Sequence, residues 1–209
     1  MNLGTAVGDD PQAVARNRAR LASLLPSEPR WLTQVHGKAV VGAGSLTAPF
    51  EADASFATDC GVVCAVLIAD CLPILIADRD GRVVAAVHAG WRGLVSGVVE
   101  NTIAALDTDP SRLLAWLGPA IGPQKFEVGA DVFDALVSRA PETAPAFRSI
   151  GPAKWLADLF WLARQQLTAA GVGSVYGGGQ CTYSDPKRFF SHRRDRVTGR
   201  MAALIWLER

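Results

Sequence analysis

Residues 62–87 read VVCAVLIADCLPILIADRDGRVVAAV and contain three apolar runs of strand length. The runs cover residues 62–69, 74–77 and 83–87. A polar turn at 78–81, which contains Asp80-Gly81, joins the last two runs and predicts an antiparallel hairpin. Because the other connections are longer, the sheet that contains this hairpin should be mixed, with parallel and antiparallel pairs.

Helical and strand patterns alternate along the rest of the chain. Asp10 followed by Pro11 is typical of a helix start and predicts a helix over 11–25. Gly171 is typical of a helix end and predicts the end of a helix over 155–170. The other predicted elements are helices at 94–106 and 131–139 and strands at 113–117, 172–176 and 201–207. With 209 residues, 49% of them hydrophobic, the chain should form a single α/β domain over residues 1–209.

Charge and composition argue against several functional classes. The formal net charge is +1, which indicates no basic surface for nucleic acid. No apolar run reaches the ~18 residues that a membrane-spanning helix needs, and no signal-peptide pattern is present at the N-terminus. The four cysteines, at positions 60, 64, 71 and 181, are too few for a disulfide framework and are expected to be reduced. We expect a cytoplasmic protein that binds neither nucleic acid nor a membrane.

Three short motifs each place a metal-ligating or nucleophilic side chain beside a turn-forming Gly or Pro. They are Gln34-Val35-His36-Gly37, Ala69-Asp70-Cys71-Leu72-Pro73 and His88-Ala89-Gly90-Trp91-Arg92-Gly93. At such a position a strand ends and its last side chain projects into a cleft. The chain has only three histidines, and two of them, His36 and His88, occur in these motifs with Cys71. This pattern predicts a metal site with two histidines and one cysteine.

The predicted hairpin brings two of these residues close together. If its turn is centred between Arg79 and Asp80, Cys71 lies directly opposite His88. If Asp80-Gly81 forms the loop instead, the two residues are offset by two positions. In both registers Cys71 and His88 leave the hairpin at the same end, within reach of one ion. The alternative is that they are a buried thiol and a core histidine.

Motifs along nearly the whole chain resemble those of a known family. Besides the three motifs above, they are Asn2-Leu3-Gly4, Gly8-Asp9, Asn17-Arg18, Ala52-Asp53-Ala54, Leu117-Gly118-Pro119-Ala120-Ile121-Gly122, Cys181-Thr182, Phe189-Phe190-Ser191-His192-Arg193-Arg194 and Thr198-Gly199-Arg200. Together and in order they resemble the YfiH family. This family is also called the laccase-domain or multicopper polyphenol oxidase family and, more recently, the purine nucleoside phosphorylase family that includes FAMIN.

The resemblance implies a three-layer α/β/α domain related to cysteine hydrolases of the cytotoxic necrotizing factor type. It also implies a zinc ion held by His36, Cys71 and His88, with a fourth position open to water or substrate. The family's usual N-terminal segment is expected to be missing, because the chain begins at the family's Asn-Leu-Gly motif. Gln124-Lys125 stand where the family often has a cysteine.

The family has been assigned phosphorolysis of adenosine, inosine and methylthioadenosine, adenosine deamination, and copper-dependent phenol oxidation. Laccases hold several coppers with many more histidines than the three in this chain. Zinc deaminases usually carry H-x-E and P-C-x-x-C motifs, which are missing here. A zinc-bound hydroxide could still attack C6 of adenine by the same Lewis-acid chemistry. The resemblance therefore implies a zinc-dependent purine nucleoside phosphorylase with adenosine deaminase side activity. Its partners would be a small-molecule nucleoside and phosphate, and it would be a monomer or a homodimer.

Four residues are predicted to be catalytic: Cys71, His88, Arg92 and His192. Arg92 lies four residues after His88, in a Gly-flanked turn that opens a predicted helix, where a guanidinium and free N–H groups can bind phosphate. Arg193 and Arg194 offer a second phosphate-binding group, and the adjacent His192 offers a proton donor.

Two alternative chemistries remain open for the same residues. A site with two histidines and one cysteine also suits copper(II), which would support laccase-like polyphenol oxidase activity. In the second alternative Cys71 and His88 are the nucleophile and base of an amide hydrolase that edits peptidoglycan precursors. Asp70, next to Cys71, either orients a histidine of the site or caps its turn.

Overall fold

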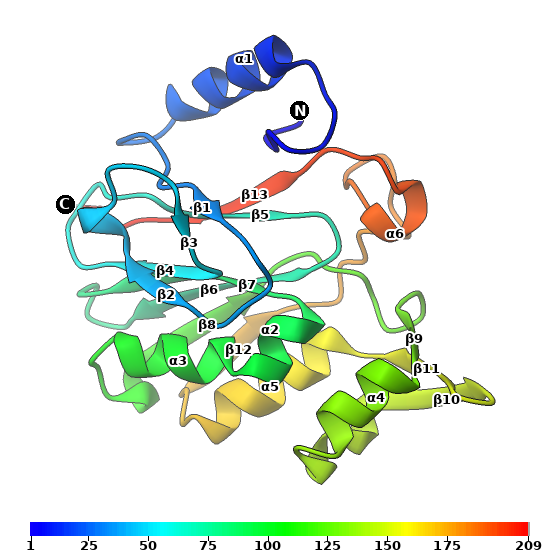
Figure 1. Ribbon diagram of the computed structural model, residues 1–209. Coiled ribbons are helices and arrows are strands. Elements are labelled where there is room, and N and C mark those ends of the chain that lie inside the picture. The colour runs from blue at the N-terminus through cyan, green and yellow to red at the C-terminus, as the bar shows by residue number, and fades with distance from the viewer. Residues whose placement is uncertain (209) are drawn as a thin grey trace.

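The computed structural model describes residues 1–208, and its centre is a mixed sheet of six strands (Figure 1). In spatial order the strands are β12 (Ser174–Gly177), β8 (Leu113–Leu117), β6 (Leu72–Asp78), β7 (Val84–Ala89), β4 (Ala54–Ala57) and β2 (Val40–Gly42). β6 pairs antiparallel with β7 and β8, and β4 pairs antiparallel with β7. The β8–β12 and β2–β4 pairs are parallel, which confirms the predicted mixed sheet.

Helices cover one face of this sheet, and a pair of strands covers the other (Figure 1). The helices are α2 (Trp91–Ser96), α3 (Val98–Ala105) and α5 (Leu159–Ala169). The pair consists of β5 (Cys64–Ile68) and β13 (Met201–Ile205), which run antiparallel, and α1 (Pro11–Ala22) lies beyond it. The layer order therefore differs from the expected α/β/α arrangement. The reason is that β5 is apolar on both faces and mostly buried, so it can cover the sheet without a helix.

The remaining elements are short. A three-stranded antiparallel sheet, with α4 (Ala130–Val137) beside it, extends from one end of the molecule (Figure 1). Its strands are β9 (Glu127–Gly129), β11 (Lys154–Ala157) and β10 (Phe147–Gly151). β1 (Leu32–Thr33) pairs in parallel with β3 (Phe50–Glu51), and α6 (His192–Asp195) is a single turn. Single-turn 3₁₀ segments occupy Ala43–Ser45 and Pro110–Arg112, and a longer one occupies Pro141–Ala146.

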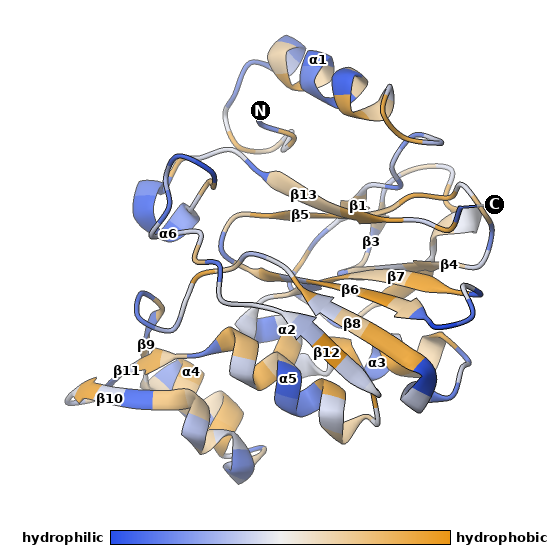
Figure 2. Cartoon of the chain, turned by 180° about the vertical axis from the view of Figure 1, so that it is seen from behind, coloured by the Kyte–Doolittle hydropathy of each residue, from blue (hydrophilic) through white to orange (hydrophobic). Residues whose placement is uncertain are grey.

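The central strands contribute to two apolar cores, one on each face of the sheet. In β7, Ala85 and Val87 join the core under the helices, whereas Val84 and Ala86 join the core under β5. All six residues of β7 are buried, which explains its almost continuous apolar sequence. Figure 2 shows the same hydrophobic colouring along β5, β6, β7 and β13. Full burial of a Val or Leu side chain contributes about 1.5–3 kcal/mol, so this centre is the stable part of the fold.

Two predicted helices differ from the structure. The helix expected over 94–106 is two helices, because Gly97 between them has a φ of 91°, in the left-handed region. The helix expected over 155–170 begins only at Leu159, where the Asp158 side chain caps it by accepting the N–H of Trp161. The residues before this cap form β11 instead, paired between β10 and β9.

The hairpin between β6 and β7 has the second of the two predicted registers. Ala77 pairs with Val84 and Pro73 pairs with His88, so Cys71 and His88 are offset by two positions. Both residues lie at the same end of the hairpin, as predicted. None of the helices within residues 1–208 is long and apolar enough to cross a membrane.

Candidate metal centre

His36, Cys71 and His88 come together at one end of the central strands β6 and β7. His36 lies in the loop between β1 and β2, Cys71 directly precedes β6, and His88 lies near the end of β7. Their potential ligand atoms all lie within 4.8 Å of one another. The two imidazole rings meet edge to face, with centroids 4.8 Å apart. The predicted convergence of the three side chains is therefore present in the fold.

The centre is open on one side and closed on the other. His36 is exposed, Cys71 is half-buried, and His88 is buried with 4% of its surface accessible. Such a gradient lets a small molecule reach the centre while the sheet holds the inner ligand. Gly90 belongs to the closed side, because a Cβ built on it would lie 2.8 Å from Cys71 Sγ. A larger residue at this position would displace the thiol.

Two residues at the centre have unusual backbone conformations. His36 has a φ of 61° and Asp70, directly before Cys71, has a φ of 93°. Non-glycine residues adopt this left-handed region rarely and at a cost, and such residues cluster at functional sites. The backbone of His36 directs its own imidazole towards the centre, and the backbone of Asp70 directs the side chain of the next residue, Cys71, towards it.

Asp53 also belongs to the candidate centre, and it is not among the site residues predicted from the sequence. Its carboxylate is fully buried, and Oδ1 accepts a hydrogen bond from Nδ1 of His88 at 2.8 Å. This contact fixes the ring so that Nε2 faces the centre. In the sequence, Asp53 contributed only to a family motif. The available signal was a carboxylate between alanines at the start of a buried strand, since a buried charge needs partners.

The side chains of the centre shift one another's pKa values. Burial raises the pKa of the Cys71 thiol, but the charge of His88 and hydrogen bonds with both imidazoles outweigh burial and lower it to about 6. Burial lowers the pKa of His88, but the charge of Cys71 and the bond to Asp53 outweigh burial and raise it to about 9. Burial also raises the pKa of Asp53, and its hydrogen bonds lower it to below the ordinary value. The shifts of Cys71 and His88 both favour the charged pair of thiolate and imidazolium over the neutral pair.

The donor set fits a zinc ion. Two nitrogens and one sulfur around a tetrahedral zinc are about 3.3–3.5 Å apart, given Zn–N near 2.0 Å and Zn–S near 2.3 Å. A mutual limit of 4.8 Å therefore requires only small side-chain movements to close around an ion. Two imidazoles and a thiolate with an exposed side also match zinc sites that keep one position open. His192 lies outside this group of residues.

Asp70 does not orient a histidine, contrary to one of its two predicted roles. Its carboxylate accepts hydrogen bonds from the hydroxyl of Thr182 and from the backbone N–H of Arg193, both at 2.6 Å. Its carbonyl accepts the N–H of Ile121 at 2.9 Å. Asp70 thus connects the start of β6 to two distant loops, and Asp53 supplies the orienting carboxylate instead.

The predicted phosphate-binding residues fall into different environments. All five N–H donors of the Arg194 guanidinium are used, by the carbonyls of Thr182, Tyr183 and Phe189 and by the carboxylate of Asp195. Arg194 therefore closes its own loop, and it would have to give up one of these bonds in order to bind phosphate.

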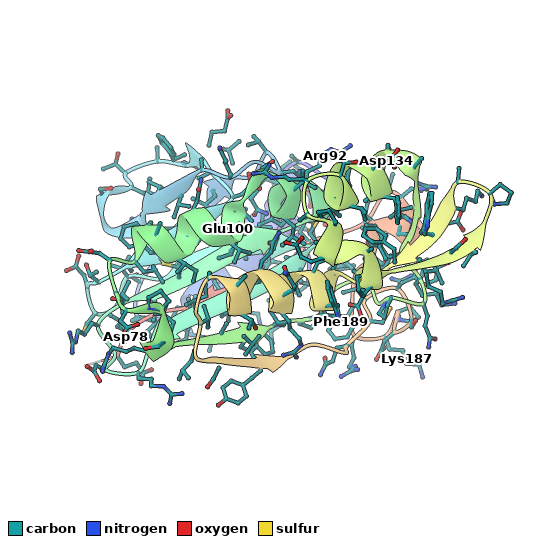
Figure 3. All side chains as sticks on the ribbon, turned by 90° about the horizontal axis from the view of Figure 1, so that it is seen from below. Asp78, Arg92, Glu100, Asp134, Lys187 and Phe189 are labelled. Atoms are coloured by element: carbon teal, nitrogen blue, oxygen red, sulfur yellow. The ribbon has the colours of Figure 1, made fainter. Side chains whose placement is uncertain are left out.

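Arg92 and Arg193 have fewer internal partners. Arg92 is exposed near the start of α2, its guanidinium lies 4.3 Å from the centre of the Trp91 ring, and it forms no ion pair within residues 1–208 (Figure 3). Arg193 donates from one side-chain nitrogen to the carbonyl of Glu127 at 2.6 Å, and its guanidinium lies over Phe126. His192, at the start of α6, is exposed.

Comparison with known proteins gives a consistent result over the whole chain. The multi-copper polyphenol oxidoreductase laccase family matches residues 1–208. A protein named purine nucleoside phosphorylase YfiH from Shigella flexneri is 52% identical over 210 residues, covering 99% of this chain and 86% of that protein. Its namesake from Escherichia coli K12 is 51% identical with the same coverage.

Solved structures agree with this relationship. The crystal structure of Neisseria meningitidis protein NMB0706 superimposes with a TM-score of 0.96 at 53% identity, covering 100% of this chain and 86% of that one. YlmD from Geobacillus stearothermophilus superimposes with a TM-score of 0.91 at 35% identity, covering 100% and 85%. The chain therefore belongs to the multi-copper polyphenol oxidoreductase laccase family, whose curated relatives carry the name purine nucleoside phosphorylase.

Proposed function

We propose that this chain is a zinc-dependent purine nucleoside phosphorylase that acts on adenosine, inosine and methylthioadenosine, with adenosine deamination as a side activity. The observation that carries the proposal is the convergence of His36, Cys71 and His88, with His88 oriented by Asp53. The names of relatives about 50% identical to this chain support the same activity. Location in the cytoplasm and a monomeric or homodimeric state remain predictions.

The proposed reaction transfers the ribosyl group from a purine to phosphate. A phosphate oxygen bonds to C1′ of the ribose, the bond from C1′ to the purine nitrogen breaks, and the purine leaves with a proton. A zinc ion held by His36, Cys71 and His88 would supply a Lewis acid that stabilises developing negative charge. In the side activity on adenosine, the oxygen of a water molecule would bond to C6 of the base, and the bond from C6 to the amino nitrogen would break with release of ammonia.

The chain's own residues have separate proposed tasks. Arg92 and Arg193 bind and orient phosphate, because both retain guanidinium donors with no partner among residues 1–208. His192 donates the proton that the leaving purine takes up, since it is exposed and follows a buried N-cap, Ser191. His88 is fixed by the sheet and serves as the inner ligand.

Product analysis tests this proposal directly. Purified protein is incubated with inosine in the presence and absence of phosphate, and sugar products are separated by chromatography. We expect hypoxanthine and ribose 1-phosphate, formed only with phosphate. Free ribose at the same rate with and without phosphate would mean hydrolysis and would contradict the proposal.

A second candidate function is favoured by one observation. The thiol of Cys71 lies beside the imidazole of His88, which bonds to the carboxylate of Asp53. This order of groups is that of a cysteine hydrolase. In this candidate the metal-free protein hydrolyses an amide, as in the editing of peptidoglycan precursors, and the relation to cytotoxic necrotizing factor-type hydrolases applies. Metal analysis separates the two. About one zinc per chain after purification without added metal favours the phosphorylase. Metal-free protein with a readily alkylated Cys71 favours the hydrolase. Copper in place of zinc favours phenol oxidation.

A further inference from the structure

A buried aspartate connects the two histidine-bearing segments of the metal centre. Asp53 has 0% of its surface exposed and immediately precedes β4. His36 lies in the loop between β1 and β2, and His88 lies in β7, which pairs with β4. The carboxylate therefore lies between a loop and a strand that are far apart in the sequence.

Each oxygen of this carboxylate accepts two hydrogen bonds. Oδ1 accepts from the backbone N–H of His36 at 2.9 Å and from Nδ1 of His88 at 2.8 Å. Oδ2 accepts from the backbone N–H of Gly37 at 2.6 Å and of Val35 at 3.2 Å. A buried carboxylate without partners is strongly unfavourable. Here every donor that compensates for its burial belongs to a segment that carries a ligand.

The same contacts hold the conformations of both ligands. Three consecutive backbone N–H groups, of residues 35–37, donate to the one carboxylate and keep His36 at its left-handed φ of 61°. His88 is held twice, because its backbone N–H also donates to the carbonyl of Asp53 at 2.7 Å. The ring and the main chain of His88 thus share one anchor.

We propose that Asp53 is the positioning residue that preforms the metal site, because one carboxylate holds two of its three ligands. The inference rests on the metal centre of the proposed function. Cys71 shares no hydrogen bond with Asp53 in the described part of the chain, so loss of the carboxylate should disturb the two histidines and leave the thiolate in place. A contribution to folding alone would leave metal affinity unchanged in a variant that folds.

The test is the affinity of Asp53→Asn for zinc, measured by competition with a chromophoric chelator. An Asn side chain keeps one acceptor oxygen and replaces the other by an NH₂ group, which cannot accept from backbone N–H groups. We expect zinc affinity to fall about 10- to 100-fold, as for other residues that orient metal ligands. The visible spectrum of the cobalt-substituted variant should also change, because the ligand geometry changes.

Asp78→Asn is a matched control. Asp78 is another buried carboxylate, with 3% of its surface exposed, at the opposite end of β6 from Cys71 (Figure 3). It forms long ion pairs with Arg82 at 3.9 Å and Arg112 at 3.7 Å, and neither arginine belongs to the ligand group. Zinc affinity should stay at the wild-type value in this variant. Circular dichroism of both variants checks that they fold.

The outcomes separate this inference from the proposed function. If the wild-type protein does not bind zinc, the proposed metal centre fails whatever Asp53 does. If the wild-type protein binds zinc and folded Asp53→Asn binds it equally well with an unchanged cobalt spectrum, the positioning role is overturned. Should Asp53→Asn not fold, ¹⁵N NMR of the zinc-loaded wild-type protein decides. The inference requires a proton on Nδ1 of His88 and metal on Nε2, and metal on Nδ1 would overturn it.

Discussion

Two buried aspartates at the centre, Asp53 and Asp70, bond to different parts of the molecule. Asp53 bonds to the ligand-bearing segments themselves, from a position next to the central sheet. Asp70 bonds to Thr182 and to the backbone of Arg193, neither of which is in the ligand group. Asp53 therefore holds the segments of the proposed ligands His36 and His88, whereas Asp70 holds two loops that carry none of the three proposed ligands. Substitutions on the two sides should therefore separate metal binding from substrate binding.

Removing the thiolate should have the largest effect. Cys71→Ala deletes the only thiolate of the ligand set, so the variant should lose both bound zinc and nucleoside cleavage. Metal content by mass spectrometry and inosine cleavage by chromatography check this. Cys60→Ala is the control, because Cys60 is exposed and is not part of the ligand group. Wild-type activity in metal-free Cys71→Ala would falsify the metal mechanism.

Zinc affinity should depend steeply on pH. The pKa of His88 is raised to about 9, so below that pH the ring must release a proton before it can bind metal. The pKa of Cys71 is lowered to about 6, so above that pH the thiol is already ionised. Between pH 7 and 8.5, apparent affinity should therefore rise about tenfold per pH unit, through His88 alone. Calorimetry in buffers of different ionisation enthalpy measures the released proton, and a flat profile would contradict the coupled pair.

Removing an arginine from the substrate side should leave the metal in place. Arg92→Ala should raise KM for phosphate about 10- to 100-fold, because a hydrogen bond to a charged group contributes about 1.5–3 kcal/mol. Zinc content should not change, and stability should shift by less than about 0.5 kcal/mol, as expected for a surface residue. Arg20→Ala, an exposed arginine on α1, is the control. An unchanged phosphate dependence would remove Arg92 from the site.

Neutralising the second aspartate sharpens the comparison with Asp53→Asn. In Asp70→Asn one oxygen that accepts from Thr182 or Arg193 becomes an NH₂ group, which should lower the unfolding free energy by about 1–3 kcal/mol. KM for nucleoside should rise because the loop of Arg193 loosens. Zinc affinity should stay at the wild-type value, because Asn tolerates the positive φ of Asp70 that places Cys71. Denaturant titration and chelator competition measure the two effects. Equal loss of zinc in Asp53→Asn and Asp70→Asn would mean that the two sides are not separate.

The smallest effect is expected at His192. His192→Tyr retains a ring with a polar tip and should keep zinc and much of the activity. His192→Ala should lower turnover, because the proposed proton donor is lost. Steady-state kinetics with parallel metal analysis distinguishes the two variants. Loss of zinc in His192→Tyr would return this histidine to the ligand group.

Local sequence patterns predicted the parts of the fold and site that depend on local chemistry. The Asp80-Gly81 turn determined the hairpin register, and the end of that hairpin placed Cys71 beside His88. The pattern did not reveal that Gly97 ends a helix, because an isolated glycine within an apolar run is ambiguous. Asp53 was missed because its partners lie in segments far away along the chain.

The phosphate-binding residues show the same limit. Arg193 and Arg194 are adjacent in the sequence and look equivalent there. Only the folded loop shows that all side-chain donors of Arg194 bond to carbonyls and Asp195. In the described part of the chain, Arg193 donates from one guanidinium nitrogen only. Adjacent side chains on a short turn point in different directions, which no local pattern encodes.

Metal reconstitution shows whether the ion at the centre supports the reaction. Zinc is stripped from the protein with a chelator, and phosphorolysis of inosine is then measured as zinc is added back in steps. If His36, Cys71 and His88 hold the ion that supports the reaction, the stripped protein is inactive and activity rises linearly to a plateau at about one zinc per chain. Full activity of the stripped protein, or recovery with copper and not with zinc, would contradict the account.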